Sequence, residues 1–321
     1  MSASSAASEH YPDLAVEIRG LTKTYAARGK QPAKTALHGI DLHIPRGSMF
    51  GLLGPNGAGK STLINIMAGL VNKSGGLAKV WDYDTTAQPR QARSAIGVVP
   101  QELNLDAFFS PYELLELQAG LYGIPKGQRI TDHLLSAVGL TDKAHAGART
   151  LSGGMRRRLM VAKAMVHQPP VLVLDEPTAG VDVELRQSLW AYVRELNRNG
   201  TTVLLTTHYL EEAEELCDQI AIINHGAVVA NAPKAELLGR LDNKEIIITL
   251  ATPLGALPEA LQSAGFTLPT PLQLRLRYQP SQMPMTRILS LLHATAVPIA
   301  DIATRETDLQ DIFLQLTRQA A

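Results

Sequence analysis

Apolar and polar positions follow three different patterns in the first seventy residues. Apolar residues alternate with polar ones over 14–18 and again over 37–44, which predicts two half-exposed strands. The run 49–53 is continuously apolar and predicts a buried strand. Helical spacing then follows over 63–70. The chain is therefore predicted to begin with two half-exposed strands. A buried strand, a loop and a helix follow them.

The continuous apolar runs and the helical spacing recur further along the chain. Continuous apolar runs predict buried strands at 95–100, 171–174 and 202–207. Helical spacing predicts helices over 111–123, 131–138, 153–167 and 184–197. Buried strands separated by helices are typical of an α/β fold with a central parallel sheet.

The pattern changes after about residue 243. Short alternating runs predict strands around 246–250, 272–276 and 297–302, and helices are predicted at 258–264, 284–293 and 308–317. These elements predict a small C-terminal α+β accessory domain. We expect a flexible tail over 1–12, a main domain over 13–238 with a helical subdomain over 102–165, and the accessory domain over 239–321. No metal-ligand spacing or catalytic constellation stands out in that domain, so a docking or dimer-stabilising role is favoured over a regulatory ligand site.

Composition narrows the class of protein. The chain has 321 residues, with 30 Lys and Arg against 30 Asp and Glu, so no overall charge favours nucleic acid or an anionic membrane. One cysteine, Cys217, excludes an internal disulfide framework and suits a reducing compartment. No apolar run approaches the roughly 18 residues of a membrane-spanning helix. We therefore expect a soluble, cytoplasmic protein that reaches a membrane only through a partner.

The loop between the strand at 49–53 and the helix after it carries the strongest signal. It fits the phosphate-binding pattern G-x-x-x-x-G-K-[S/T] in its expected strand–loop–helix context. Glycines let backbone N–H groups surround phosphate oxygens, and the helix N-terminus adds partial positive charge. Lys60 is expected to reach the β- and γ-phosphates, and the Ser61 hydroxyl to bind Mg²⁺. The nucleotide-binding residues predicted here are Gly54, Pro55, Asn56, Gly57, Ala58, Gly59, Lys60, Ser61 and Thr62.

Polar residues follow directly after the predicted buried strands, where open α/β sheets place their ligands. Asp175 and Glu176 end the strand at 171–174; Asp175 is expected to hold Mg²⁺ and Glu176 to polarise an attacking water. His208 follows the next strand and is either structural or a γ-phosphate contact. Gln101 follows the strand at 95–100 and is either a surface residue or reaches the metal or the water.

Three further features have two readings each. Ser152, followed by Gly153 and Gly154, predicts a capped helix start. This helix start either has no ligand or binds the phosphate of a second nucleotide. Tyr25 either packs at a sheet edge or stacks under a base. Phe108 and Phe109 are either core residues or an exposed patch for a partner.

Taken in order, these motifs resemble the ATP-binding subunit of an ABC transporter over residues 14 to about 235. The resemblance implies an ABC ATPase core with a mixed sheet, ATP and Mg²⁺ as ligands, and adenine stacking on Tyr25. It implies that Gln101 binds Mg²⁺ and links the nucleotide to a membrane partner, with residues 102–123 at the docking surface. It also implies that Ser152, Gly153 and Gly154 close over the ATP of a second subunit. Asp182 would be an inter-subunit loop residue and His208 a switch histidine. Met155 departs from the commonest family form, which has glutamine there.

The chain further resembles the drug, antibiotic and lipid exporter branch, whose ATPase pairs with a separate six-helix permease. This resemblance rests on the LSGGM form at 151–155, the Gly-Val-Asp turn at 180–182 and the closing segment 307–314. This resemblance implies a homodimer that hydrolyses ATP at the cytoplasmic face of the inner membrane, without nucleic acid. Two alternatives remain. One is an importer ATPase of the smaller-substrate kind. The other is a soluble ABC ATPase acting on nucleic acid or the ribosome, which the single phosphate loop and the lack of long heptad repeats disfavour.

Overall fold

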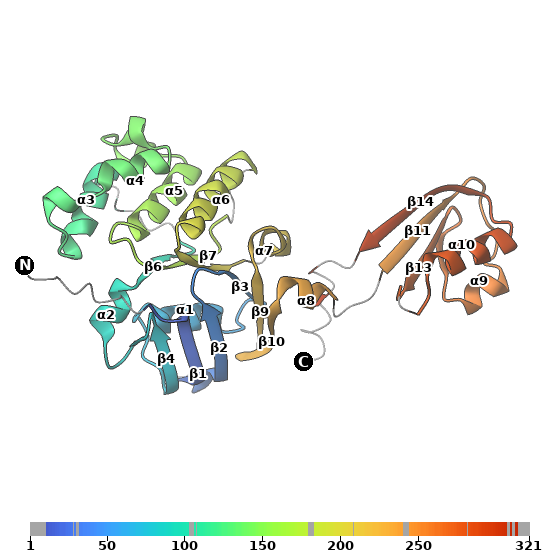
Figure 1. Cartoon of the computed structure of the whole chain (residues 1–321), viewed down its shortest axis with the longest axis horizontal. Coiled ribbons are helices and arrows are strands. Elements are labelled where there is room, and N and C mark those ends of the chain that lie inside the picture. The colour runs from blue at the N-terminus through green and yellow to red at the C-terminus, as the bar shows by residue number, and fades with distance from the viewer. Residues whose placement is uncertain are drawn as a thin grey trace, which may run out of the picture. The chain divides into compact units, whose positions relative to one another are not determined.

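A computed structural model describes residues 11–27, 29, 32–102, 106, 108–178, 183–207, 209–239, 244–280, 282–306, 309 and 312–313. The chain folds into two compact units, residues 1–233 and 234–319 (Figure 1). Each unit has its own sheet or sheets. The described residues contain no helix long and apolar enough to cross a membrane.

The first unit contains two sheets. The antiparallel sheet has the order β2-β1-β4-β5, formed by β1 (Leu14–Tyr25), β2 (Lys34–Pro45), β4 (Gly75–Val80) and β5 (Tyr83–Asp84). The central sheet has the order β10-β9-β3-β8-β7-β6, formed by β3 (Met49–Leu53), β6 (Ile96–Val99), β7 (Val171–Asp175), β8 (Thr202–Thr206), β9 (Gln219–Asn224) and β10 (Ala227–Pro233). All neighbours in the central sheet are parallel except β9 and β10.

Seven α-helices of the described chain belong to this first unit. They are α1 (Lys60–Met67), α2 (Pro89–Ser94), α3 (Pro111–Leu121), α4 (Thr131–Ala137), α5 (Gly153–Ala164), α6 (Val183–Arg198) and α7 (Leu210–Leu216). Helices α3 to α6 gather on the side of the central sheet away from the antiparallel sheet (Figure 1). Helix α1 packs its leucine, isoleucine and methionine side chains into one hydrophobic core shared with both sheets. This packing fixes the position of α1.

The parallel strands explain where the functional residues lie. Strands β3, β8, β7 and β6 run in the same direction, so the residues that follow their carboxyl ends share one edge. Those residues include the phosphate loop after β3, Asp175 and Glu176 at the end of β7, and Gln101 after β6. The fold therefore brings together motifs more than a hundred residues apart.

The second unit begins with α8 (Lys234–Gly239) and continues as β11 (Lys244–Leu250), α9 (Glu259–Ser263), β12 (Thr267–Thr270), β13 (Gln273–Tyr278), α10 (Met285–Ala294) and β14 (Ile299–Glu306). After α8 the order is β-α-β-β-α-β, and the antiparallel sheet has the order β12-β13-β11-β14. This order and pairing are those of a ferredoxin-like split βαβ fold. Its own core packs Ile246, Ile248 and Leu250 of β11 with residues of β13, α9 and α10.

Several boundaries differ from the sequence prediction. The first helix ends at Met67 rather than near Leu70, because Gly69 takes a left-handed φ of 69° and Leu70 is exposed. The last strand begins at Ile299 and runs to Glu306, later than the predicted 297–302. Strands β4, β5, β9, β10 and β12 and helices α2, α7 and α8 were not predicted. Most of the predicted helix at 308–317 lies outside the described residues.

Candidate active site

The phosphate loop wraps tightly around the start of α1. Gly59 precedes the helix with φ 111°, and an added Cβ there would lie 2.8 Å from Leu37 and 2.9 Å from the Ala36 carbonyl. An added Cβ at Gly54 would lie 2.3 Å from the Ile223 carbonyl on β9. Neither position has room for a side chain, so the glycines are required for the loop to pack against the sheet.

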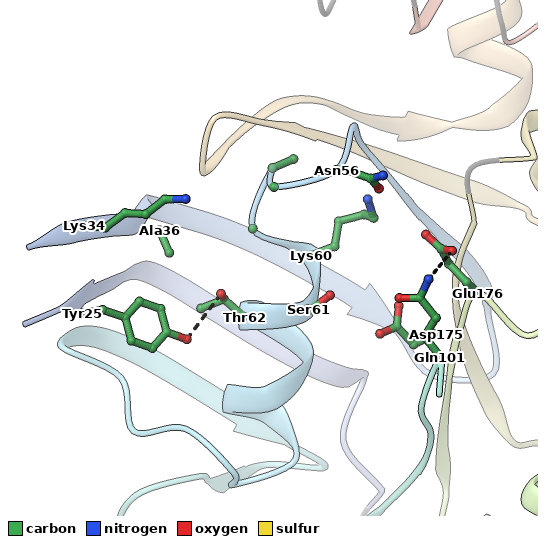
Figure 2. A pocket seen from close by; sticks show the side chains of 13 residues that line it. Tyr25, Lys34, Ala36, Asn56, Lys60, Ser61, Thr62, Gln101, Asp175 and Glu176 are labelled. Atoms are coloured by element: carbon green, nitrogen blue, oxygen red, sulfur yellow. Dashed lines mark hydrogen bonds between the residues drawn. The ribbon is translucent and has the colours of Figure 1, made fainter. Parts of the chain in front are cut away.

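Lys60 is buried at the base of this loop. Its Nζ donates to the carbonyl of Gly54 at 2.6 Å and to that of Pro55 at 3.2 Å. Burial lowers the pKa of Lys60, while the nearby charges of Glu176 and Asp175 oppose that shift. Figure 2 shows the Lys60 side chain between the loop and the two carboxylates. A cation held here is placed to meet an anion that enters the loop.

The loop lines a cavity of about 220 Å³ at the carboxyl edge of the central sheet. The cavity brings together these predicted site residues: Tyr25, Asn56, Gly57, Ala58, Gly59, Lys60, Ser61, Thr62, Gln101, Asp175 and Glu176. Sequence reasoning missed two further lining residues, Lys34 and Ala36. Lys34 stands opposite Tyr25 in the β1–β2 pairing, a register that could not be read before the hairpin was known.

Tyr25 lies at one end of this cavity. The residue is 40% exposed, and its hydroxyl is 3.5 Å from the Thr62 hydroxyl (Figure 2). The Lys23 ammonium lies 4.8 Å from the ring centroid. A partly open aromatic face beside the phosphate loop is suited to stacking a base.

At the other end of the cavity, Thr206 of β8 forms hydrogen bonds with both Asp175 and Glu176. Its hydroxyl donates to Asp175 Oδ1 and accepts from the backbone N–H of Glu176 at 3.2 Å. Burial raises the pKa of Asp175, the Thr206 hydrogen bond opposes this, and the neighbouring Glu176 charge adds to it. Thr206 was predicted only as a strand residue, so its role in the site was missed.

Glu176 has an unusual backbone. Its φ is 47°, a left-handed conformation that costs a residue with a Cβ about 1–3 kcal/mol. Its N–H also donates to the Thr206 carbonyl at 3.0 Å, which helps to hold this conformation. The side chain is 8% exposed, and Oε2 accepts from Gln101 Nε2 at 2.9 Å (Figure 2). The strained turn therefore directs a nearly buried carboxylate into the cavity.

Arg157 of α5 connects the helical region to the same edge. One of its guanidinium nitrogens donates to the carbonyls of Pro100 and Gln101 at 3.1 and 3.0 Å. The side chain is buried; burial lowers its pKa, while the charges of Asp175 and Glu176 favour its charged form. Arg157 was predicted only as part of a helix, and no local sequence signal could have revealed this contact.

The capped helix start at 152–154 does not line this cavity. Ser152 is the N-cap of α5, and its hydroxyl accepts from Met155 N at 3.2 Å, as the sequence predicts. Ser152 and Gly153 are exposed, and an added Cβ at Gly153 would meet nothing within 4 Å. The turn thus presents an open helix end to the outside of its own chain.

A buried acidic residue joins the segments that follow β7 and β8. Glu212 of α7 accepts hydrogen bonds from the hydroxyls of Thr178 and Thr207 and is 3% exposed. Arg186 forms an ion pair with it at 3.6 Å. Asp182 and His208 lie outside the described residues. Thr178 and Thr207 are the described residues that lead towards them on the chain.

Phe108 is 85% exposed and is therefore not a core residue, one of the two alternatives predicted for it. Phe109 is half-buried. The nearby helix α3 also exposes Leu117 and Leu121.

The fold and the cavity together define a phosphate-loop ATPase. The ABC transporter family model matches residues 37–179. The Nod factor export ATP-binding protein I of Ralstonia nicotianae is 37% identical, over 95% of this chain and 94% of that protein. The daunorubicin/doxorubicin resistance ATP-binding protein of Streptomyces peucetius is also 37% identical, over 97% and 94%. The linearmycin resistance ATP-binding protein of Bacillus subtilis is 36% identical, over 88% and 94%.

Solved structures agree with this assignment. An ATP-binding subunit of an ABC transporter superposes with a TM-score of 0.63 at 28% identity, over 70% of this chain and 92% of that one. A dimeric ATP-binding cassette in a post-hydrolysis state with ADP and Pi gives 0.61 at 26% identity, over 68% and 98%. The chain belongs to the ATP-binding proteins of ABC transporters. It binds and hydrolyses ATP.

Proposed function

We propose that this chain is the ATPase subunit of an exporter, and that two copies close around two MgATP to drive a separate membrane permease. The observation that carries this proposal is the nearly full-length similarity to relatives named for export and drug resistance, at 37% identity. On that basis the cargo is a drug-like or lipid-like molecule.

In the proposed reaction, the phosphate loop and Lys60 bind the triphosphate, and Tyr25 stacks against the base. Ser61, Gln101 and Asp175 supply oxygen atoms at one end of the cavity, a donor set that suits Mg²⁺. The metal would neutralise phosphate charge. Glu176 would accept a proton from the attacking water, with Gln101 fixing the position of its carboxylate. Asp182 and His208 keep the inter-subunit and γ-phosphate roles expected from the family resemblance.

The open helix start supports the two-chain arrangement. Ser152, Gly153 and Gly154 do not line their own cavity, yet they begin a helix whose first N–H groups can bind an anion. We assign them to the γ-phosphate of ATP bound by the partner. Each active site would then be complete only in the dimer.

The exposed apolar residues around α3 are the proposed permease contact. Phe108, Leu117 and Leu121 present an apolar surface that suits a partner rather than water. The permease, six-helix by family resemblance, would place the subunit at the cytoplasmic face of the inner membrane. The second unit would be an accessory domain, and no nucleic acid is involved.

Glu176→Gln tests the core of this proposal. The variant should bind ATP, lose about 10²- to 10⁴-fold in hydrolysis, and accumulate as an ATP-bound dimer. Lys60→Ala should lose nucleotide affinity, and Lys143→Ala, an exposed lysine outside the cavity, should behave as wild type. Normal turnover by Glu176→Gln would remove Glu176 from the proton-accepting role.

Measuring the direction of transport requires the membrane partner. The subunit co-purified with its proposed permease should accumulate cargo inside inverted vesicles when ATP is added outside. Loss of cargo preloaded in those vesicles would favour the importer alternative instead.

A further inference from the structure

A second cavity lies at the amino edge of the central sheet. Its wall includes Pro170 directly before β7, Thr201 directly before β8, and Arg46 in the turn that leads into β3. The phosphate loop and the two carboxylates lie at the opposite, carboxyl ends of the same parallel strands. The two cavities are therefore at opposite edges of one sheet, and no residue lines both.

The size and the wall of this cavity suit a small organic molecule. Its volume is about 590 Å³, within the range of roughly 300–1,000 Å³ that is common for small-molecule sites. Apolar side chains of the helices and of the segment before β7 form much of the wall, among them Ile130, Leu134, Met165, Pro169 and Leu196. All of them belong to the first unit. A wall of this kind favours a ligand with an apolar body.

A buried hydroxyl group on α6 also lines the cavity. Tyr192 is 8% exposed, and none of the residues that the structure describes forms a hydrogen bond with its hydroxyl. Burial and the charge of Glu195 raise the pKa of Tyr192 to about 12, so the hydroxyl keeps its proton at neutral pH and can donate it. Buried polar groups are normally paired, so this hydroxyl is suited to an acceptor that enters the cavity.

Two aromatic rings hold the guanidinium of Arg46 on the cavity wall. Its Cζ lies 4.2 Å from the ring centroid of Tyr11 and 5.5 Å from that of Trp81. The two rings also contact each other, edge to face, with centroids 6.1 Å apart. Within the described part of the chain, the guanidinium has no acidic partner and no hydrogen-bond acceptor. Rings cover the faces of a guanidinium and leave its N–H groups available for a carboxylate, sulfonate or phosphate.

The acidic residue on the wall is not held in the same way. Glu195 is exposed, and none of the described residues forms an ion pair or a hydrogen bond with its side chain. Fixing a long side chain costs conformational entropy. Packing against two rings has already restricted Arg46, whereas a ligand that pairs with Glu195 would have to restrict it. The charge that is held ready for a ligand is therefore positive.

We propose that this cavity binds a small amphipathic anion, with its apolar body against the aliphatic wall, its anionic group on Arg46 and an acceptor for the Tyr192 hydroxyl. The site goes beyond the proposed function because it shares no residue with the nucleotide cavity and its ligand binds while nucleotide is bound. Its failure would leave ATP hydrolysis and closure of the two ATP sites untouched.

Two dyes with the same ring system test the ligand class. Anilinonaphthalene sulfonate is an aromatic anion, and phenylnaphthylamine has the same rings without the sulfonate. The full-length protein is first saturated with ADP, so that neither dye occupies the nucleotide cavity. Fluorescence titration should then show one sulfonate dye per chain, bound more tightly than the neutral dye. A lack of saturable binding, or equal affinity for the two dyes, would overturn the proposal.

A cavity-filling substitution tests the location. Ala137 is the last residue of α4 and lines the cavity, so Ala137→Trp should abolish saturable binding of both dyes. The neighbouring Ser136 is exposed and does not line the cavity, so Ser136→Trp is the matched control and should bind both dyes as wild type does. Unchanged ADP affinity would verify that both variants fold. Equal dye binding by the two variants would show that the dye binds elsewhere.

Charge variants test the sign of the ligand. Arg46→Gln should weaken binding of the sulfonate dye by roughly tenfold and leave the neutral dye unaffected, because a hydrogen bond to a charged group is lost. Glu195→Gln should leave the affinity for the sulfonate dye unchanged or raise it, because a negative charge is removed from the wall. A lower thermal midpoint of Arg46→Gln with unchanged dye affinity would assign the ring stack to stability alone and overturn the proposal.

Tyr192→Phe separates a ligand-binding role from a structural one. The variant should bind the sulfonate dye several-fold more weakly. Its stability in urea without dye should not fall, because the hydroxyl has no hydrogen-bond partner in the described chain to lose. A loss of stability with unchanged dye affinity would show that the hydroxyl serves the fold and not a ligand.

Discussion

The side-chain amide of Gln101 donates to the Glu176 carboxylate across 2.9 Å, joining the residue after β6 to the residue after β7. The hydrogen bond fixes a carboxylate whose own backbone is already held in a strained turn. A hydrogen bond to a charged group contributes about 1.5–3 kcal/mol. We therefore expect Gln101 to position Glu176 for proton transfer.

Gln101→Ala should lower kcat by roughly 10- to 100-fold, the rate equivalent of that hydrogen bond. Affinity for a non-hydrolysable ATP analogue in the absence of Mg²⁺ should change far less, because the phosphate loop is untouched. Steady-state hydrolysis and equilibrium nucleotide binding would measure the two effects separately. A variant with wild-type kcat would show that the contact is not needed in the reaction.

Glu212→Ala should impair turnover without touching the cavity. The substitution removes the shared acceptor of Thr178 and Thr207 and leaves two buried hydroxyls without it, at a cost of about 1–3 kcal/mol each. Hydrolysis should fall at least roughly tenfold, and the thermal midpoint should fall by several degrees. Glu212→Gln keeps one acceptor oxygen and should lie between Ala and wild type. The exposed neighbour Glu211→Ala is the control, and a folded Glu212→Ala with normal hydrolysis would contradict the positioning role.

Gly97→Ala should destabilise the first unit. An added Cβ would lie 2.4 Å from the Ala164 carbonyl at the end of α5, closer than any real contact permits. Overpacking of this kind costs typically about 1–3 kcal/mol. Urea unfolding would measure the loss against Gly127→Ala, where an added Cβ meets nothing within 4 Å. Equal stability of the two variants would mean that α5 moves away from β6 without cost.

His167 should make stability fall on acidification. Its ring stacks on Tyr122 with centroids 3.7 Å apart, and Nε2 donates to the Ile96 carbonyl at 3.2 Å. Burial lowers the pKa of His167 below its usual 6.5. Between that lowered pKa and 6.5 the unfolded chain binds more protons than the folded one, so the free energy of unfolding decreases as pH falls through this window.

His167→Phe keeps an aromatic ring against Tyr122 and removes the titration. Urea unfolding at pH 7.5 and pH 5.5 should show a smaller loss of stability for the variant than for wild type. An identical loss in both proteins would assign the pH dependence to other groups.

Local pattern predicted the elements that carry the site. The apolar runs at β3, β7 and β8, the glycine loop and the Ser152 cap are all encoded within a few neighbouring residues. Strands β4 and β5 escaped prediction because the turn between them places Trp81 as well as Asp82 in a left-handed conformation, and tryptophan gives no turn signal.

Contacts between distant residues could not be predicted from pattern. Arg157 is one of three consecutive arginines on a helix, and nothing local distinguishes the one that reaches Pro100 and Gln101. Glu212 lies in a run of acidic residues typical of a solvated surface, yet it is buried against Thr178 and Thr207. Such roles follow from the strand order β8-β7-β6, which sequence spacing does not determine.

The anchoring of α5 has a mechanical consequence. Its far end rests on Gly97 of β6, and Arg157 fastens it to the backbone of Gln101, only five residues, or about 7.5 Å of helix, from Ser152. Gln101, which lines the cavity, and the serine turn, which faces outward, are therefore both attached to the same helix. A displacement of Gln101 would therefore move Ser152 as well, and in the proposed dimer this movement would reach the neighbouring subunit's site.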